Sequence, residues 1–169
     1  IQGIKLSQEN KQPEFAKVYE TSLALWKEVG DKYWEAVTMW NLAWAYFDAD
    51  RNDEALELHN QALLIFQSFI DRIGESAAFN GIGAIYKWGK NYESAKEYLE
   101  NSLTIRKQLK RLKGEFSTLN ALIAVYQGLN QSDKILESLN RMLVISQELK
   151  ERNDERLTLN LLGFFYSLT

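Results

Sequence analysis

The stretch Asn80-Gly-Ile-Gly-Ala-Ile-Tyr86, followed by Asn91-Tyr-Glu-Ser-Ala95, decides the fold. Apolar or small residues at positions 79, 82, 83 and 86 fall at i, i+3, i+4 and i+7, which is one face of an α-helix. A polar turn separates this helix from the next, and small residues at 83 and 95 allow the two helices to approach closely. These residues therefore predict a closely packed helical hairpin.

The same pattern returns with a step of 40 residues. The aromatic column consists of Tyr46, Tyr86, Tyr126 and Tyr166. Further columns with this step are Leu23/Leu63/Leu103/Leu143, Leu25/Ile65/Ile105/Ile145, Ala55/Ala95/Ile135 and Asn80/Asn120/Asn160. Because several columns agree on one period, the chain is interpreted as an array of repeated two-helix units.

The apolar stripes predict about eight helices, with short polar turns that cap the second helix of each pair. The single proline, Pro13, stands in a first turn, where proline is tolerated. First helices are expected at 33–48, 73–89, 113–128 and 153–168, and second helices at 13–29, 53–70, 93–110 and 133–150. Residues 1–9 are interpreted as the end of another first helix. The predicted fold is all-α.

The run from Asn80 to Tyr86, with Ala95, Leu99 and Ser102 after it, resembles the tetratricopeptide repeat signature. The resemblance covers nearly the whole chain and implies a right-handed α-solenoid of antiparallel helix hairpins. The 40-residue period resembles the extended subtype of kinesin light chains and of bacterial signalling proteins. We expect a single domain over 1–169, truncated at both ends, with repeat units 1–30 (partial), 31–70, 71–110, 111–150 and 151–169 (partial).

Two features depart from this repeat pattern. The small positions of the third repeat become Ile123 and Ile135, and β-branched side chains cannot pack as closely as Gly against Ala. This hairpin is predicted to splay slightly or to shift its register. Phe15, in register with Ala55, is expected to have the same effect at the N-terminal edge.

Composition narrows the classes of function. The chain has 169 residues, 20 Lys and Arg against 23 Asp and Glu, and no cysteine. A net charge of −3 does not suggest a nucleic-acid-binding surface, and no stretch approaches the roughly 18 apolar residues of a membrane span. No signal peptide is visible, but the first residue is Ile, so we interpret the chain as a piece of a longer protein. The absence of cysteine fits a reducing compartment, and a cytoplasmic location is expected.

No constellation of residues suggests an enzyme, a metal site or a cofactor. The only histidine, His59, is in register with Leu99 and Leu139 and is interpreted as a packing substitution. Gly81, Gly83, Gly89 and Lys90 do not have the spacing of a phosphate-binding loop.

A basic run ends one of the second helices, at Arg106, Lys107, Lys110, Arg111 and Lys113. A solvated helix end is the simpler interpretation, because cations near a helix C-terminus complement its dipole. The cluster is denser than capping requires, so an acidic partner stays open as the alternative.

The resemblance implies that the first helices line a concave groove that binds a peptide. The residues that it places there are Asn80, Asn120, Asn160, Trp40, Trp44, Lys87, Trp88, Gln127 and Phe164, with Phe47 beside them. An Asn amide matches the N–H and C=O groups of a peptide backbone. Packed helices stand about 8–10 Å apart and an extended chain advances about 3.3 Å per residue, so an Asn column matches about every third peptide unit.

These columns argue against one class of partner. Related domains that bind the C-terminal carboxylates of heat-shock proteins use Lys and Arg in the columns six and two residues before the repeated tyrosine. This chain carries Trp, Asn, Ala and Phe in those two columns. The amides of the Asn column also have an alternative role, which is hydrogen bonding to the neighbouring repeat. Trp40 and Trp44 alternatively pack between hairpins.

We therefore predict a scaffold or sensor module that binds a protein or an extended peptide, within a larger bacterial signalling or regulatory protein. The alternative is a self-association module, in which the apolar terminal helices join chains into a homo-oligomer. No nucleic acid, membrane, cofactor or metal is expected among its partners.

Overall fold

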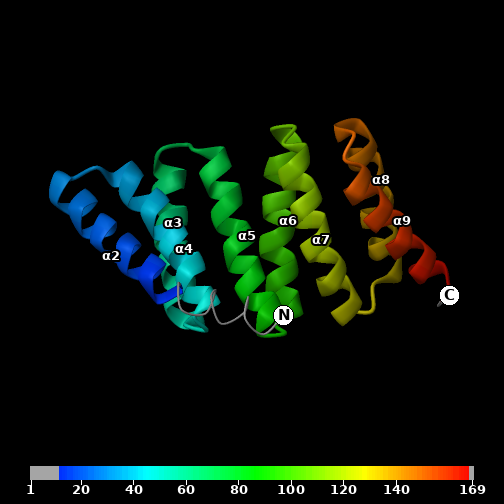
Figure 1. Ribbon diagram of the computed structural model, residues 1–169, viewed down its shortest axis with the longest axis horizontal. Coiled ribbons are helices and arrows are strands. Elements are labelled where there is room, and N and C mark those ends of the chain that lie inside the picture. The colour runs from blue at the N-terminus through cyan, green and yellow to red at the C-terminus, as the bar shows by residue number, and fades with distance from the viewer. Residues whose placement is uncertain (1–11, 168–169) are drawn as a thin grey trace. The chain divides into compact units, whose positions relative to one another are not determined.

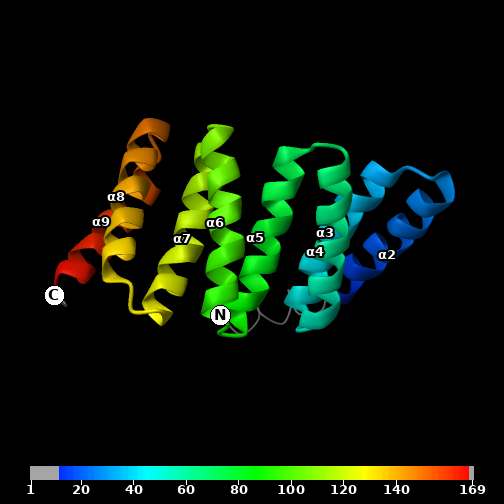
Figure 2. The ribbon, with the colours of Figure 1, turned by 180° about the vertical axis from the view of Figure 1, so that it is seen from behind.

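The computed structural model describes residues 12–167, and these form α-helices joined by short turns (Figures 1 and 2). The helices are α2 (Gln12–Val29), α3 (Lys32–Asp48), α4 (Asn52–Ser68), α5 (Arg72–Trp88), α6 (Tyr92–Gln108), α7 (Leu112–Gly128), α8 (Ser132–Leu149) and α9 (Arg152–Ser167). The predicted all-α class and the two-helix repeat are confirmed, and each helix end lies within two residues of its predicted position. The predicted helix at residues 1–9 lies outside the described residues.

Each helix from α2 to α8 is followed, one or two positions later, by a residue in the left-handed backbone conformation. These residues recur at intervals of 20. Positive φ angles occur at Gly30, Asp50, Ile70, Lys90, Lys110, Asn130 and Lys150. After the left-handed residue the chain closes the turn, as where the Arg111 N–H donates to the Arg106 carbonyl at 2.9 Å. Ile70 is unusual, because a β-branched side chain rarely adopts this backbone region.

Side chains cap only some of the helices. Asp31 accepts a hydrogen bond from the Trp34 N–H at 3.1 Å, and Asn91 accepts one from the Ser94 N–H at 3.3 Å. The turns 50–53 and 130–133 were expected to supply caps in the same way. In these turns Arg51 and Gln131 occupy the N-cap positions and make no side-chain capping bond.

The chain divides into two compact units, Ile1–Ile85 and Tyr86–Thr169, with the boundary inside α5. Each unit is described by itself, and the single domain over 1–169 stays a prediction. In unit 1, α3 packs against α2 and α4 (Figure 1). Ala43 and Ala55 are fully buried at this contact, in a cluster with Ile85. This is the close helix approach that the small residues predict.

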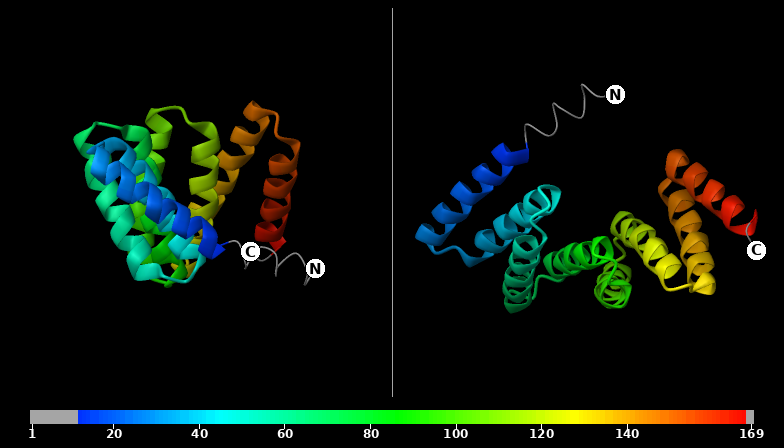
Figure 3. Two further views of the ribbon diagram at one scale, coloured as in Figure 1. Left: turned by 60° about the vertical axis from the view of Figure 1, so that its left-hand side comes forward. Right: turned by 90° about the horizontal axis from the view of Figure 1, so that it is seen from below.

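In unit 2, α7 packs against α6 and α8, and α8 packs against α9 (Figure 3). Leu99, Leu122 and Leu139 form part of one buried cluster that also contains Ile123 and Ile135. The two isoleucines therefore contribute to the core, and the splaying of their hairpin stays a prediction. In unit 1, the other departure, Phe15, is 56% exposed, whereas Ala55 in the same register is fully buried.

Two tyrosines of the repeated column, Tyr46 and Tyr126, connect a first helix to the second helix before it. In unit 1 the Tyr46 hydroxyl donates to Glu20 at 2.8 Å, and in unit 2 the Tyr126 hydroxyl donates to Glu100 at 2.9 Å. Burial and the Glu100 carboxylate raise the pKa of Tyr126. The repeated tyrosine therefore combines an apolar ring in the helix interface with a polar group that fixes the register between two helices.

Candidate functional site

Three aromatic side chains of α3 form a continuous row in unit 1. Trp40 and Trp44 meet edge to face with ring centroids 6.4 Å apart, and Trp44 meets Phe47 in the same way at 5.8 Å. All three are half-buried, and the buried Trp40 Nε1 has no hydrogen-bond partner. The row exists as the sequence predicts, but it packs partly against its own unit.

His59 on α4 lies behind this row. Its ring is fully buried and meets Trp44 edge to face at 5.4 Å. Neither ring nitrogen has a hydrogen-bond partner, and burial lowers the pKa of His59 to about 4. Gly81 on α5 makes room for the ring, because a Cβ at position 81 would lie 2.4 Å from His59 Cε1 and Nε2. These contacts fit the interpretation of His59 as a packing residue.

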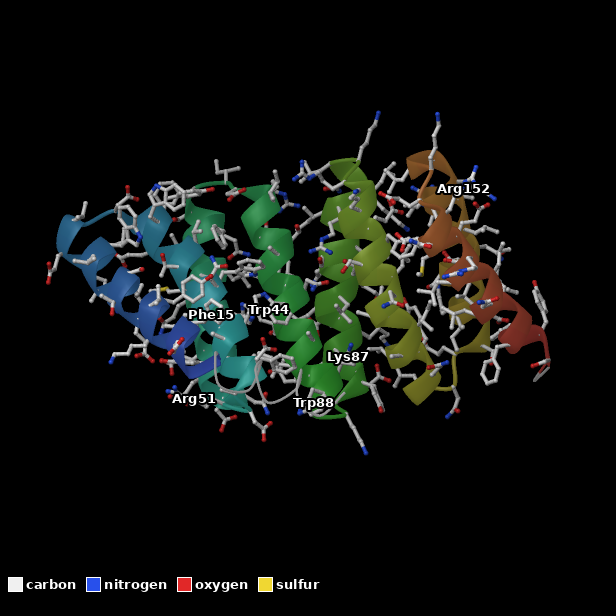
Figure 4. All side chains as sticks on the ribbon, viewed as in Figure 1. Phe15, Trp44, Arg51, Lys87, Trp88 and Arg152 are labelled. Carbon is white, nitrogen blue, oxygen red and sulfur yellow. The ribbon has the colours of Figure 1, made fainter. Side chains whose placement is uncertain are left out.

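A pocket of about 310 Å³ opens beside the aromatic row, between α2 and α3. Trp44 contributes one wall, and Phe15 lies across from it on α2 (Figure 4). The other lining residues are Tyr19, Asn41, Ala45 and Asp48. Sequence reasoning did not place α2 residues in the site, because their contact with Trp44 depends on how neighbouring hairpins pack.

The three asparagines of the predicted column have different environments. Asn120 on α7 and Asn160 on α9 are exposed, and neither amide has a hydrogen-bond partner within the described part of the chain. Asn80 is half-buried in unit 1 and takes part in a further interaction. Asn41, one position later in its repeat, donates from Nδ2 to the Val37 carbonyl at 2.8 Å and is already engaged.

The remaining predicted residues lie in unit 2. Lys87 is half-exposed and Trp88 is 66% exposed at the end of α5 (Figure 4). Gln127 on α7 is exposed, and Phe164 on α9 is 60% exposed. The predicted set therefore falls into two groups: Trp40, Trp44 and Asn80 in unit 1, and the other six in unit 2. Whether these residues bind a ligand stays a prediction.

The basic run contains one structural residue. Arg106 is half-buried, and its Nη1 donates to the Gly114 carbonyl at 2.7 Å and to Thr118 Oγ1 at 2.6 Å. Burial lowers the pKa of this guanidinium. Arg106 therefore joins α6 to α7, whereas Lys107 and Lys110 remain exposed.

Residues 12–167 contain neither a group of side chains suited to a metal ion nor a helix suited to spanning a membrane. Within this range no group of three or more His, Asp or Glu side chains is arranged to hold a metal ion. No helix in the range combines the length and the apolar character that crossing a membrane requires.

The comparison with protein families identifies the repeat. Two family models, both described as tetratricopeptide repeat, match residues 16–68 and 76–109, which together make up more than half of the chain. The chain belongs to the tetratricopeptide repeat (TPR) family. TPRs generally mediate interactions between proteins, and they generally act as scaffolds without catalytic activity. A comparison with curated proteins gave no match to this TPR chain.

Solved structures share the TPR fold. BtubC (BKLC) from P. vanneervenii superposes with a TM-score of 0.76 at 21% identity, over 84% of this chain and 59% of that one. Two structures of nearly identical TPR-like repeats from a Podosopora anserina kinesin light chain give TM-scores of 0.68 and 0.67 at 16% identity. They cover 95% and 96% of this chain, and 89% and 90% of their own. The chain thus spans 59% of the BtubC structure.

Proposed function

We propose that this TPR array is a scaffold or sensor module that binds an extended peptide segment of a partner protein along its first helices. The proposal places the array within a larger, cytoplasmic bacterial signalling or regulatory protein. Asn120 and Asn160 hold the peptide backbone in unit 2, with Gln127 and Phe164 beside them. In unit 1, the residues that contact the peptide are Trp40, Trp44 and Asn80.

The observation that carries the proposal is the pair of exposed amides at Asn120 and Asn160. They occupy the same repeat position, and neither forms a hydrogen bond within the described residues. Each amide retains two donors and one acceptor, which match the C=O and N–H groups of a peptide backbone. Inter-repeat bonding does not engage these two amides, so they remain open to a ligand.

Aromatic side chains supply the apolar part of such a site. Phe164 is 60% exposed, and Trp44 lines a pocket of about 310 Å³. Rigid aromatic side chains are frequent anchors in protein interfaces. Asn side chains that bind the peptide backbone, together with aromatic anchors, would make the affinity depend little on the charge of the peptide.

We expect the Asn120→Ala/Asn160→Ala variant to lose its partner and keep its fold. Each lost amide contact to a backbone removes about 1 kcal/mol, so affinity should fall at least tenfold. The measurement is affinity capture from lysate, followed by titration of the captured protein. The matched control is Asn101→Ala/Asn140→Ala, which removes two exposed amides from the second helices α6 and α8. Equal capture by the two double variants and the wild type would refute a site on the first helices.

Self-association is the second candidate, and exposed apolar side chains on α9 support it. Leu157 and Leu159 are 48% and 49% exposed, and Phe164, which is 60% exposed, lies on the same face of α9 as Leu157. Large exposed apolar patches often mark interfaces.

If α9 joins two chains, sedimentation will show a dimer that dissociates in the Leu157→Ser/Leu159→Ser variant. Leu162 is unsuitable for this test because it is only 8% exposed and supports the core. A monomer at all protein concentrations would remove this candidate.

A further inference from the structure

Two adjoining hollows lie in unit 2, between the second helices α6 and α8 and over α7. They share Lys107 of α6 and Arg141 of α8. The larger hollow has a volume of about 470 Å³. Its other lining residues are Lys110, Leu112, Glu115 and Glu148. None of the residues proposed for the peptide site lines either hollow, so the hollows are a separate candidate site.

Arg141 is held in position at the junction of the two hollows. Its Nε donates to Glu115 Oε1 at 2.7 Å, and its Nη2 donates to Glu115 Oε2 at 3.0 Å. The Glu115 side chain is 1% exposed, whereas that of Arg141 is 36% exposed. The third guanidinium nitrogen, Nη1, has no hydrogen bond among the described residues. A fixed cation with a free donor therefore contributes to the wall of the hollow.

Two lysines beside Arg141 have no carboxylate partner among residues 12–167. Lys107 is exposed and lies in the last turn of α6. Lys110 adopts the left-handed backbone conformation after this helix, and its N–H donates to the Lys107 carbonyl at 3.0 Å. By contrast, Lys96, Lys113 and Lys134 of unit 2 each form an ion pair with a glutamate. The ammonium groups of Lys107 and Lys110 therefore line the same hollow and form no ion pair among the described residues.

We propose that this hollow binds carboxylate side chains of an acidic segment on a partner protein. Glu115 neutralises Arg141, so the remaining lining charges are Lys107 and Lys110 against Glu148. The local excess of one positive charge, with a free donor on the fixed Arg141, suits charge-assisted hydrogen bonds to a carboxylate. Nucleic acid is a poorer fit, because it requires an extended basic surface and this hollow contains two carboxylates of its own.

The test uses the whole chain and a hexaglutamate peptide, with hexaglutamine as the uncharged control, in NMR titrations at low ionic strength. We expect hexaglutamate to shift the backbone signals of Lys107, Lys110 and Arg141, and hexaglutamine to leave them unchanged. The Lys107→Glu/Lys110→Glu variant should bind hexaglutamate at least tenfold more weakly. Glu148→Gln, which removes the opposing charge, should bind it more tightly than the wild type.

Lys96→Glu/Lys113→Glu is the matched control for total charge, because it changes two lysines that already have partners and that line neither hollow. It should bind within a factor of three of the wild type, and circular dichroism should show unchanged helix content in all variants. Equal weakening in the two double variants would refute a local site, as would no shift with hexaglutamate. Single-stranded DNA of the same charge that binds as tightly, and depends on the same lysines, would overturn the assignment to an acidic protein segment.

Discussion

Replacing Arg141 with methionine is expected to lower the free energy of unfolding by about 3 kcal/mol, because it leaves the Glu115 carboxylate buried without its partner. Glu115 is 1% exposed and both of its oxygens accept hydrogen bonds from Arg141. Urea unfolding followed by circular dichroism at neutral pH measures this loss.

Two controls separate burial of charge from loss of a surface contact. The Arg141→Met/Glu115→Met variant removes both charges, and its stability should lie within about 1 kcal/mol of the wild type. Lys134→Met breaks an exposed pair with Glu137 and should change stability by less than about 1 kcal/mol. An Arg141→Met variant no less stable than Lys134→Met would show that Glu115 does not depend on Arg141.

The second prediction concerns acid sensitivity caused by His59. Burial lowers the pKa of His59 in the folded chain to about 4, below its ordinary value of 6.5. Between these two values the unfolded chain binds a proton that the folded chain does not bind. Stability therefore falls as the pH decreases from about 6.5 to about 4, and the total loss from this residue is about 3 kcal/mol. Above pH 7 His59 is neutral in both the folded and the unfolded chain, so it causes no loss of stability there.

The His59→Leu variant isolates that contribution, since His59 is the only histidine of the chain. Leucine occupies the same register at Leu99 and Leu139, both of which are buried. We expect the variant to be more stable at pH 7 by about 1–2 kcal/mol, because two buried nitrogens without partners are removed. Its advantage should grow as the pH falls to 4. Chemical unfolding at several pH values gives both curves, and parallel curves would contradict the prediction.

The sequence predicts the helices of this protein well because local patterns determine them. The apolar period places each helix, and the polar turns that end them recur at equal spacing. The small residues Ala43 and Ala55 also indicate a close contact that the structure contains. In each of these cases, the relevant residues lie within one hairpin, where helix geometry relates sequence spacing directly to position.

Specific side-chain contacts between helices were not predicted. Arg141 and Glu115 are 26 residues apart, and nothing in either residue alone indicates that they pair. One signal was present: Glu20 and Glu100 are two repeat periods apart, and each accepts a hydrogen bond from a repeated tyrosine 26 residues later. A search for polar residues at matching repeat positions could have found that contact. The pocket beside Trp44 had no such signal, because Phe15 departs from its column.

The left-handed residues at intervals of 20 determine how an array of this kind can change in length. One residue more or fewer within a helix rotates all later side chains of that helix by about 100°. Buried columns would then face solvent, and the tyrosine hydroxyls would lose their glutamates. Adding or removing a whole hairpin preserves every column. Evolution can therefore lengthen or shorten such an array by duplicating or deleting complete repeats, whereas gradual changes within a helix would be eliminated.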